Sequence, residues 1–85
     1  MTGEMMLRQA AAVVANRRAT YGDPAASMAT VAKRWSITLG RTVTPAQVVL
    51  CLIDLKMARL AFDPNHLDSM VDIAGYAAVL REVSR

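Results

Sequence analysis

Residues 44–61 constrain this chain most, because they signal a helix start and are apolar on nearly every side. Thr44 is suited to cap the helix, Pro45 to take its first position, and Gln47 to complete a capping box. The apolar run "VVLCLI" follows directly. A helix that is apolar nearly all round is typical of a buried position. We therefore expect this helix to lie at the centre of the fold.

Three further segments repeat apolar residues at helical spacing and are expected to be helices: about 3–19, 24–39 and 66–83. Gly22 is free to take a positive φ, Asp23 is a good N-cap, Gly40 is a natural stop, and Asn65 is expected to cap the last helix. No segment shows the pattern of a strand. The prediction is a single all-α domain over residues 1–85, a compact four-helix bundle.

The composition is unusually apolar for so short a chain. Of the 85 residues, 54% are hydrophobic, and the mean hydropathy is +0.27. A domain of this size buries only about 60–65% of the surface that its unfolded chain exposes. We therefore expect some apolar surface to lie between subunits of a homo-oligomer, at least a dimer.

Cysteine usage and charge exclude several classes of protein. Cys51 is the single cysteine and has apolar neighbours, so we expect a buried thiol and a reducing, cytoplasmic setting. We expect no signal peptide, and the longest apolar run, Val48 to Ile53, is far shorter than the roughly 20 residues of a membrane span. The net charge of +3 is spread along the chain, and no block resembles a nucleic-acid tail.

The last helix carries two acids and a tyrosine at a spacing of four residues. Asp68, Asp72 and Tyr76 are expected to share one helix face. Two carboxylates one turn apart can hold a divalent cation such as magnesium. Acids in the first turns of a helix are also favoured by its dipole and simply face water. Spacing alone favours the second interpretation. Gly75, beside this face, is costly within a helix and indicates the close approach of another helix or of a ligand, and helix packing is the favoured reason.

The preceding helix carries a basic pair and one acid. Lys56 and Arg59 are three residues apart, so they either bind phosphate, extend their charged ends from an apolar helix into solvent, or pair with Asp68 and Asp72. Asp54 interrupts an apolar run, and a buried carboxylate requires a partner. We therefore expect Asp54 to be shielded from solvent and bound to a basic group, such as Arg59 or Arg17, or to a metal.

The turn "RRATYGDP" raises a similar pair of alternatives. Arg17, Arg18 and Tyr21 precede a helix whose first N–H groups could bind an anion such as phosphate. The alternative is a capped turn with no ligand, and the residues favour it. His66 is the single histidine, which makes a zinc site improbable.

Four stretches of the chain together resemble a family of small, uncharacterised phage and prophage proteins. They are "RRATYGDP", Trp35, "TPAQVVLCLIDLKMARL" and "DPNHLDSMVDIAGYA". The family shares the YGDP turn, the tryptophan, the K-x-x-R helix and the D-x-x-x-D-x-A-G-Y-A helix. The resemblance covers about residues 16–80, nearly the whole chain. It implies a phage-type protein without specifying an activity.

More distantly, the last two helices resemble MazG-like and nucleotide-modification-associated domains. The resemblance implies an all-α oligomer that hydrolyses nucleoside triphosphates with magnesium. Those domains pair an E-x-x-E helix with an E-x-x-D helix. Here Asp72 matches the final acid, Ser69 stands where the preceding glutamate would be, and Asp54 is the acid of the earlier helix.

Two functions follow as hypotheses. The first is a helical accessory protein that binds a nucleotide or a host or phage protein through the charged site on its last two helices. The second is a MazG-like pyrophosphohydrolase. The sequence favours the first. The expected phosphate-binding residues are Arg17, Arg18, Tyr21, Lys56, Arg59 and Tyr76, and the expected magnesium ligands are Asp54, Asp68 and Asp72.

Overall fold

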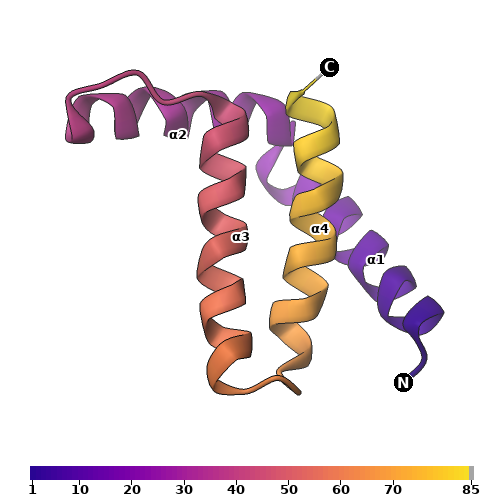
Figure 1. Cartoon of the computed structure of the whole chain (residues 1–85). Helices are drawn as coiled ribbons and strands as arrows, with labels where there is room; N and C mark the ends of the chain where they lie inside the picture. Colours follow the sequence, from indigo (N-terminus) through magenta and orange to yellow (C-terminus); the bar gives the residue numbers. More distant parts are fainter. Residues whose placement is uncertain (85) are drawn as a thin grey trace.

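The computed structural model describes residues 1–84, and in this range the chain folds into four α-helices without a strand (Figure 1). The helices are α1 (Gly3–Tyr21), α2 (Pro24–Leu39), α3 (Pro45–Phe62) and α4 (Leu67–Val83). The predicted all-α, four-helix fold is confirmed. In the described range, none of these helices combines the length and the apolar character needed to cross a bilayer.

The predicted start and stop signals explain most helix boundaries. The Thr44 side chain accepts a hydrogen bond from the Gln47 backbone N–H, and the Gln47 side chain accepts one from the Thr44 N–H, at 3.1 and 3.0 Å. This reciprocal pair is the predicted capping box. Gly40 ends α2 at a φ of +67°, in the left-handed region that glycine adopts without strain.

The start of α4 differs from the prediction. His66, not Asn65, is the N-cap residue, and it makes no side-chain capping hydrogen bond. Instead, the backbone N–H of Asn65 donates to the carboxylate of Asp63 at 3.1 Å. The turn before α4 is thus held by an aspartate that hydrogen-bonds two residues ahead.

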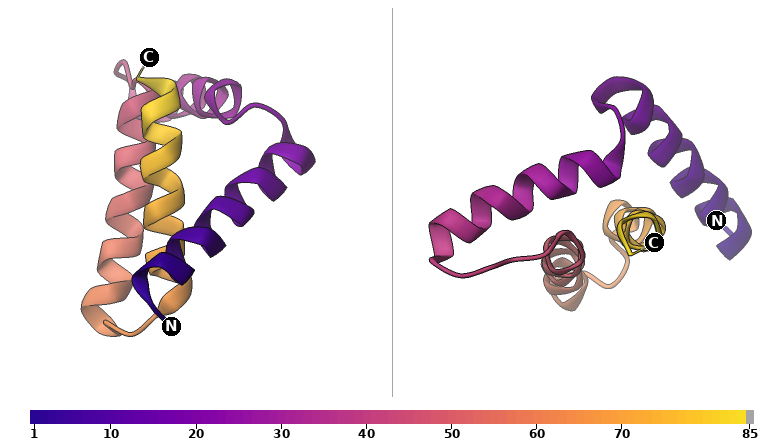
Figure 2. Two further views of the ribbon diagram at one scale, coloured as in Figure 1. Left: turned by 90° about the vertical axis from the view of Figure 1, so that its right-hand side faces the viewer. Right: turned by 90° about the horizontal axis from the view of Figure 1, so that it is seen from above.

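The helices are arranged around α4. α3 and α4 lie side by side and run in opposite directions, and α2 crosses one end of this pair (Figure 1). α1 packs against α4 on the other side (Figure 2). α4 therefore contacts all three other helices, whereas α1 and α3 do not pack against each other. The expectation that residues 44–61 form the central helix was wrong, because the apolar surface of α3 is only partly covered within the chain.

The buried core is small. Its hydrophobic members with little or no exposed surface are Ala10, Ala32, Val48, Val49 and Val71. Two of them, Val48 and Val49, come from the first turn of α3, while Cys51 is exposed. The expectation of a buried thiol was wrong because Cys51 lies on the side of α3 that no other helix covers.

The capping box generates a stability prediction. We expect Thr44→Ala to lower the free energy of unfolding by about 1 kcal/mol, because the first turn of α3 loses its side-chain acceptor. Chemical denaturation measures this change. Thr42→Ala is the matched control, since Thr42 is exposed and lies outside the capping box. Equal losses in the two variants would contradict a specific role for the cap.

Candidate functional site

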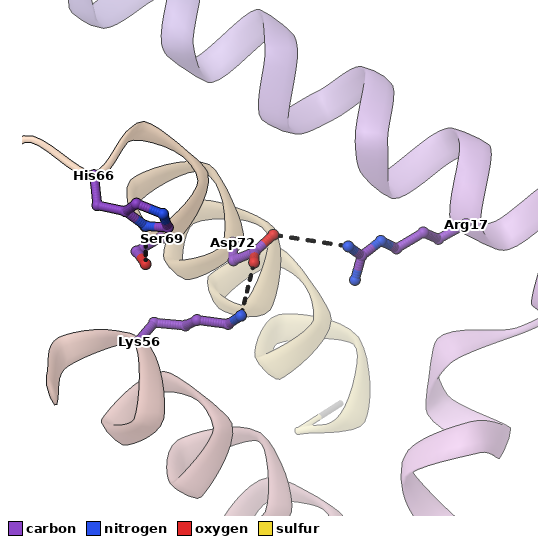
Figure 3. Close-up of polar contacts among 5 residues, drawn as sticks. All are labelled: Arg17, Lys56, His66, Ser69 and Asp72. Carbon is purple, nitrogen blue, oxygen red and sulfur yellow. Dashed lines mark hydrogen bonds and ion pairs between the residues drawn. The ribbon is translucent and has the colours of Figure 1, made fainter. Parts of the chain in front are cut away.

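The carboxylate of Asp72 is the centre of the charged site. Its Oδ2 lies 3.0 Å from Nζ of Lys56 on α3, and its Oδ1 lies 3.8 Å from a terminal nitrogen of Arg17 on α1 (Figure 3). The side chains of Asp72 and Lys56 are only 17% and 13% exposed, whereas that of Arg17 is 58% exposed. The close, shielded contact is therefore with Lys56, and Arg17 keeps most of its donors accessible.

A buried serine lies one turn before Asp72 on the same side of α4. Ser69 has no exposed surface, and its hydroxyl lies 2.7 Å from Nδ1 of His66. This contact satisfies a hydroxyl that would otherwise be costly to bury. The hydrogen bond also holds the imidazole of His66 at the N-terminal end of α4, beside the charged site (Figure 3). His66 is thus a structural residue of the helix start.

Next to Asp72, a cavity of about 380 Å³ opens between α1, α2, α3 and α4. Its walls are mainly aliphatic and include Val14, Met28, Leu52 and Val79. Five polar residues also line it: Arg17, Tyr21, Ser27, Asp72 and Tyr76. Mostly apolar walls with a few convergent polar groups are typical of small-molecule sites, whose volumes are about 300–1,000 Å³.

The structure brings together four of the predicted phosphate-binding and metal-binding residues in this cavity: Arg17, Tyr21, Asp72 and Tyr76. Lys56 adjoins them through its ion pair with Asp72. The two remaining basic residues lie elsewhere. Arg18 forms an ion pair with Glu82, and Arg59 is exposed and forms no ion pair within residues 1–84.

The three predicted magnesium ligands do not come together. Asp54 and Asp68 are exposed, and Asp72 is already bound to two cationic side chains. Within residues 1–84, no group of three or more acidic, histidine or cysteine side chains could hold a metal ion. The expectation that Asp54 is shielded and paired was wrong for the single chain, because Asp54 lies on the uncovered side of α3.

The YGDP turn is a capped turn, as the sequence favoured. Gly22 has a φ of +85°, and the Asp23 carboxylate accepts a hydrogen bond from the Ala25 N–H at 3.1 Å. The Ser27 N–H donates to the Asp23 carbonyl, and Pro24 has no N–H to offer. The first turn of α2 therefore has few donors left for an anion.

Gly75 permits the predicted close approach of two helices. A Cβ atom added at Gly75 would lie 3.4 Å from Cγ2 of Val14 on α1. The cavity is formed partly by this contact, since both residues line it. The glycine therefore lies where a side chain of α1 approaches α4 closely.

The sequence reasoning missed the residues that α2 and α3 contribute to the cavity, chiefly Ser27, Met28 and Leu52. Ser27 and Met28 lie one turn beyond the YGDP turn, which was a usable signal. Leu52 is one of several equivalent apolar residues in α3, and nothing in its local sequence distinguishes it.

The shielded ion pair generates a second stability prediction. We expect Lys56→Met to lower the free energy of unfolding by about 1–3 kcal/mol, because the Asp72 carboxylate loses its close partner. The double variant Lys56→Met/Asp72→Leu should recover most of this loss, since no unpaired charge remains. Thermal or chemical denaturation measures both. A double variant less stable than Lys56→Met would contradict this account of the pair.

Comparison with known proteins places the chain among phage proteins. The Gene 55 protein of Mycobacterium phage L5 is 36% identical to it over 80 residues, which cover 92% of this chain and 51% of the phage protein. The chain thus spans about half the length of this curated relative. No solved structure matches it. The resemblance to an uncharacterised phage family is supported, while the similarity to MazG-like domains stays a prediction. The model of the family described as Domain of unknown function (DUF6378) matches residues 5–84, and the chain belongs to this family.

Proposed function

We propose that this protein binds a nucleotide in the cavity beside Asp72, with the base inside the cavity and the phosphate at Arg17. The observation that carries the proposal is a mostly aliphatic cavity of about 380 Å³ with an accessible guanidinium at its edge. A nucleotide has the complementary chemistry, since a planar base is joined to an anionic group.

The walls suit a base. Tyr21 on α1 and Tyr76 on α4 line the same cavity, and aromatic rings stack favourably on a planar ligand. The hydroxyl of Ser27, which also lines the cavity, offers an acceptor for an exocyclic N–H group of a base. A small number of polar groups in an apolar cavity can fix the orientation of a ligand and still leave room for it.

Arg17 suits a phosphate better than Lys56 does. The contact between Arg17 and Asp72, at 3.8 Å, is longer than a hydrogen bond, so the guanidinium donors remain available. Guanidinium groups bind phosphate through two parallel N–H donors. Lys56 is shielded and lies 3.0 Å from Asp72, so its role is to hold that carboxylate in place.

The arrangement favours binding over magnesium-dependent hydrolysis. Magnesium requires several oxygen ligands in near-octahedral geometry. Asp54 and Asp68 are exposed and apart from the cavity, and Asp72 is occupied by cations. The side chains present do not fit the ion, so no hydrolytic step is assigned to them.

The test is calorimetric titration with a panel of nucleosides, nucleoside monophosphates and nucleoside triphosphates. We expect at least one nucleotide to bind and Arg17→Gln to weaken it about tenfold or more, because a charge-assisted hydrogen bond to phosphate is lost. Arg18→Gln is the matched control, since Arg18 is the next residue but pairs with Glu82 outside this cavity. It should bind the nucleotide as the unmodified protein does.

Three results would overturn the proposal. If no member of the panel binds, the cavity is not a nucleotide site. If Arg17→Gln and Arg18→Gln weaken binding equally, the nucleotide is held outside this cavity. If pyrophosphate is released in the presence of magnesium and Asp72→Asn abolishes the release, the protein is an enzyme and not a binding module.

A further inference from the structure

One face of α3 is apolar and uncovered along most of the helix. We define this outer face by six residues that are all exposed in the single chain: Leu50, Cys51, Leu55, Met57, Ala58 and Phe62. At roughly 100° per residue they span roughly 160° of the circumference. Of the two fully buried valines of α3, Val49 lies on the opposite side, and Val48 lies just beyond the edge of the outer face at Leu55. The outer face also includes one charged residue, Asp54.

The arrangement of the helices explains why this face has no partner within the chain. α3 packs against α4 and α2 and has no packing contact with α1 (Figure 2). α2 crosses only one end of the α3–α4 pair (Figure 1). Phe62, at the far end of α3, is 94% exposed. Large apolar side chains left together on one surface are typical of an interface.

The surface that the chain leaves exposed is large enough for an interface with a second copy. The accessible surface is 5908 Å², whereas a compact monomer of this mass exposes about 4,900 Å². The radius of gyration is 13.6 Å, against about 12 Å for a compact domain of 85 residues. The excess of about 1,000 Å² is close to the roughly 800 Å² that each partner buries in a standard interface.

We propose that the outer face of α3 is the interface with a second copy of this chain. In a two-fold dimer the same patch of each subunit meets itself, so a mostly apolar face is its own complement. Pairing two such helices side by side would place the α3–α4 hairpins of two chains in one larger bundle. The interface would supply the apolar burial that the small core of the single chain lacks.

The dimer would leave the cavity open. Leu52, the residue by which α3 lines the cavity, points away from the outer face, as the helical spacing requires. The proposal is therefore independent of nucleotide binding, and either one can fail without the other.

The first test measures the mass of the protein in solution by light scattering. We expect twice the chain mass of 9.2 kDa at micromolar concentration. Ala58→Glu should raise the dissociation constant about tenfold or more, because it adds a charge near the middle of the outer face. Ala58 is exposed and glutamate is a good helix former, so the fold is retained. Ala12→Glu, the same change at an exposed site on α1, should leave the dimer intact.

The second test uses the thiol on the outer face. Cys51 is exposed in the single chain, so a dimer should protect it from a thiol reagent. We expect the labelling rate per chain to fall as the protein concentration rises, and to stay high in Ala58→Glu. A stable monomer, including one that binds lipid vesicles or another protein, would overturn the proposal. So would a dimer that Ala58→Glu and Ala12→Glu affect equally, or labelling that is independent of concentration.

Discussion

The carboxylate of Asp72 lies where three of the four helices meet. It lies on α4, the one helix that contacts all the others, and it binds a lysine from α3 and an arginine from α1. A shielded charge requires a partner at a fixed position, so Lys56 sets how α3 lies against α4. The same carboxylate lines the cavity. One carboxylate therefore links the packing of α3 on α4 to the chemistry of the candidate site.

A second constraint is the small amount of apolar surface that a chain of this length can cover. The buried hydrophobic side chains are all alanine and valine, while several leucine and methionine side chains remain about half exposed. α3 shows the division clearly. One side packs on α4 and α2, and the other carries the outer face. α3 is apolar on every side because it carries two apolar surfaces, one packed on α4 and α2 and one exposed in the single chain.

The start and stop signals of the helices were readable because they are local. The capping side chains of Thr44, Gln47 and Asp23 hydrogen-bond to backbone N–H groups within three residues. The two glycines with positive φ change the direction of the chain at their own positions. The placement of α3 was not readable, since an apolar residue that packs on another helix and one that stays exposed in the single chain look alike in sequence. Asp54 and Cys51 were misplaced for this reason.

The cavity could be predicted only in part. Arg17 and Tyr21 belong to one motif, and Asp72 and Tyr76 to another, so each pair was found from its own segment. That the two pairs share a cavity depends on how α1 packs on α4. No local pattern specifies this packing, although Gly75 indicated that some helix comes close.

α1 is the least firmly held element of the chain. Ala10 is its single buried residue, its neighbours on α4 are mainly small, and its ion pair between Arg18 and Glu82 is partly exposed. Segments with few buried contacts open locally at a lower free energy than the rest of a fold. Backbone amides of α1 should therefore exchange hydrogen for deuterium sooner than those of α4. Arg17 and Tyr21 belong to α1 and line the cavity. An opening that moves this part of α1 away from α4 therefore also removes one wall of the cavity.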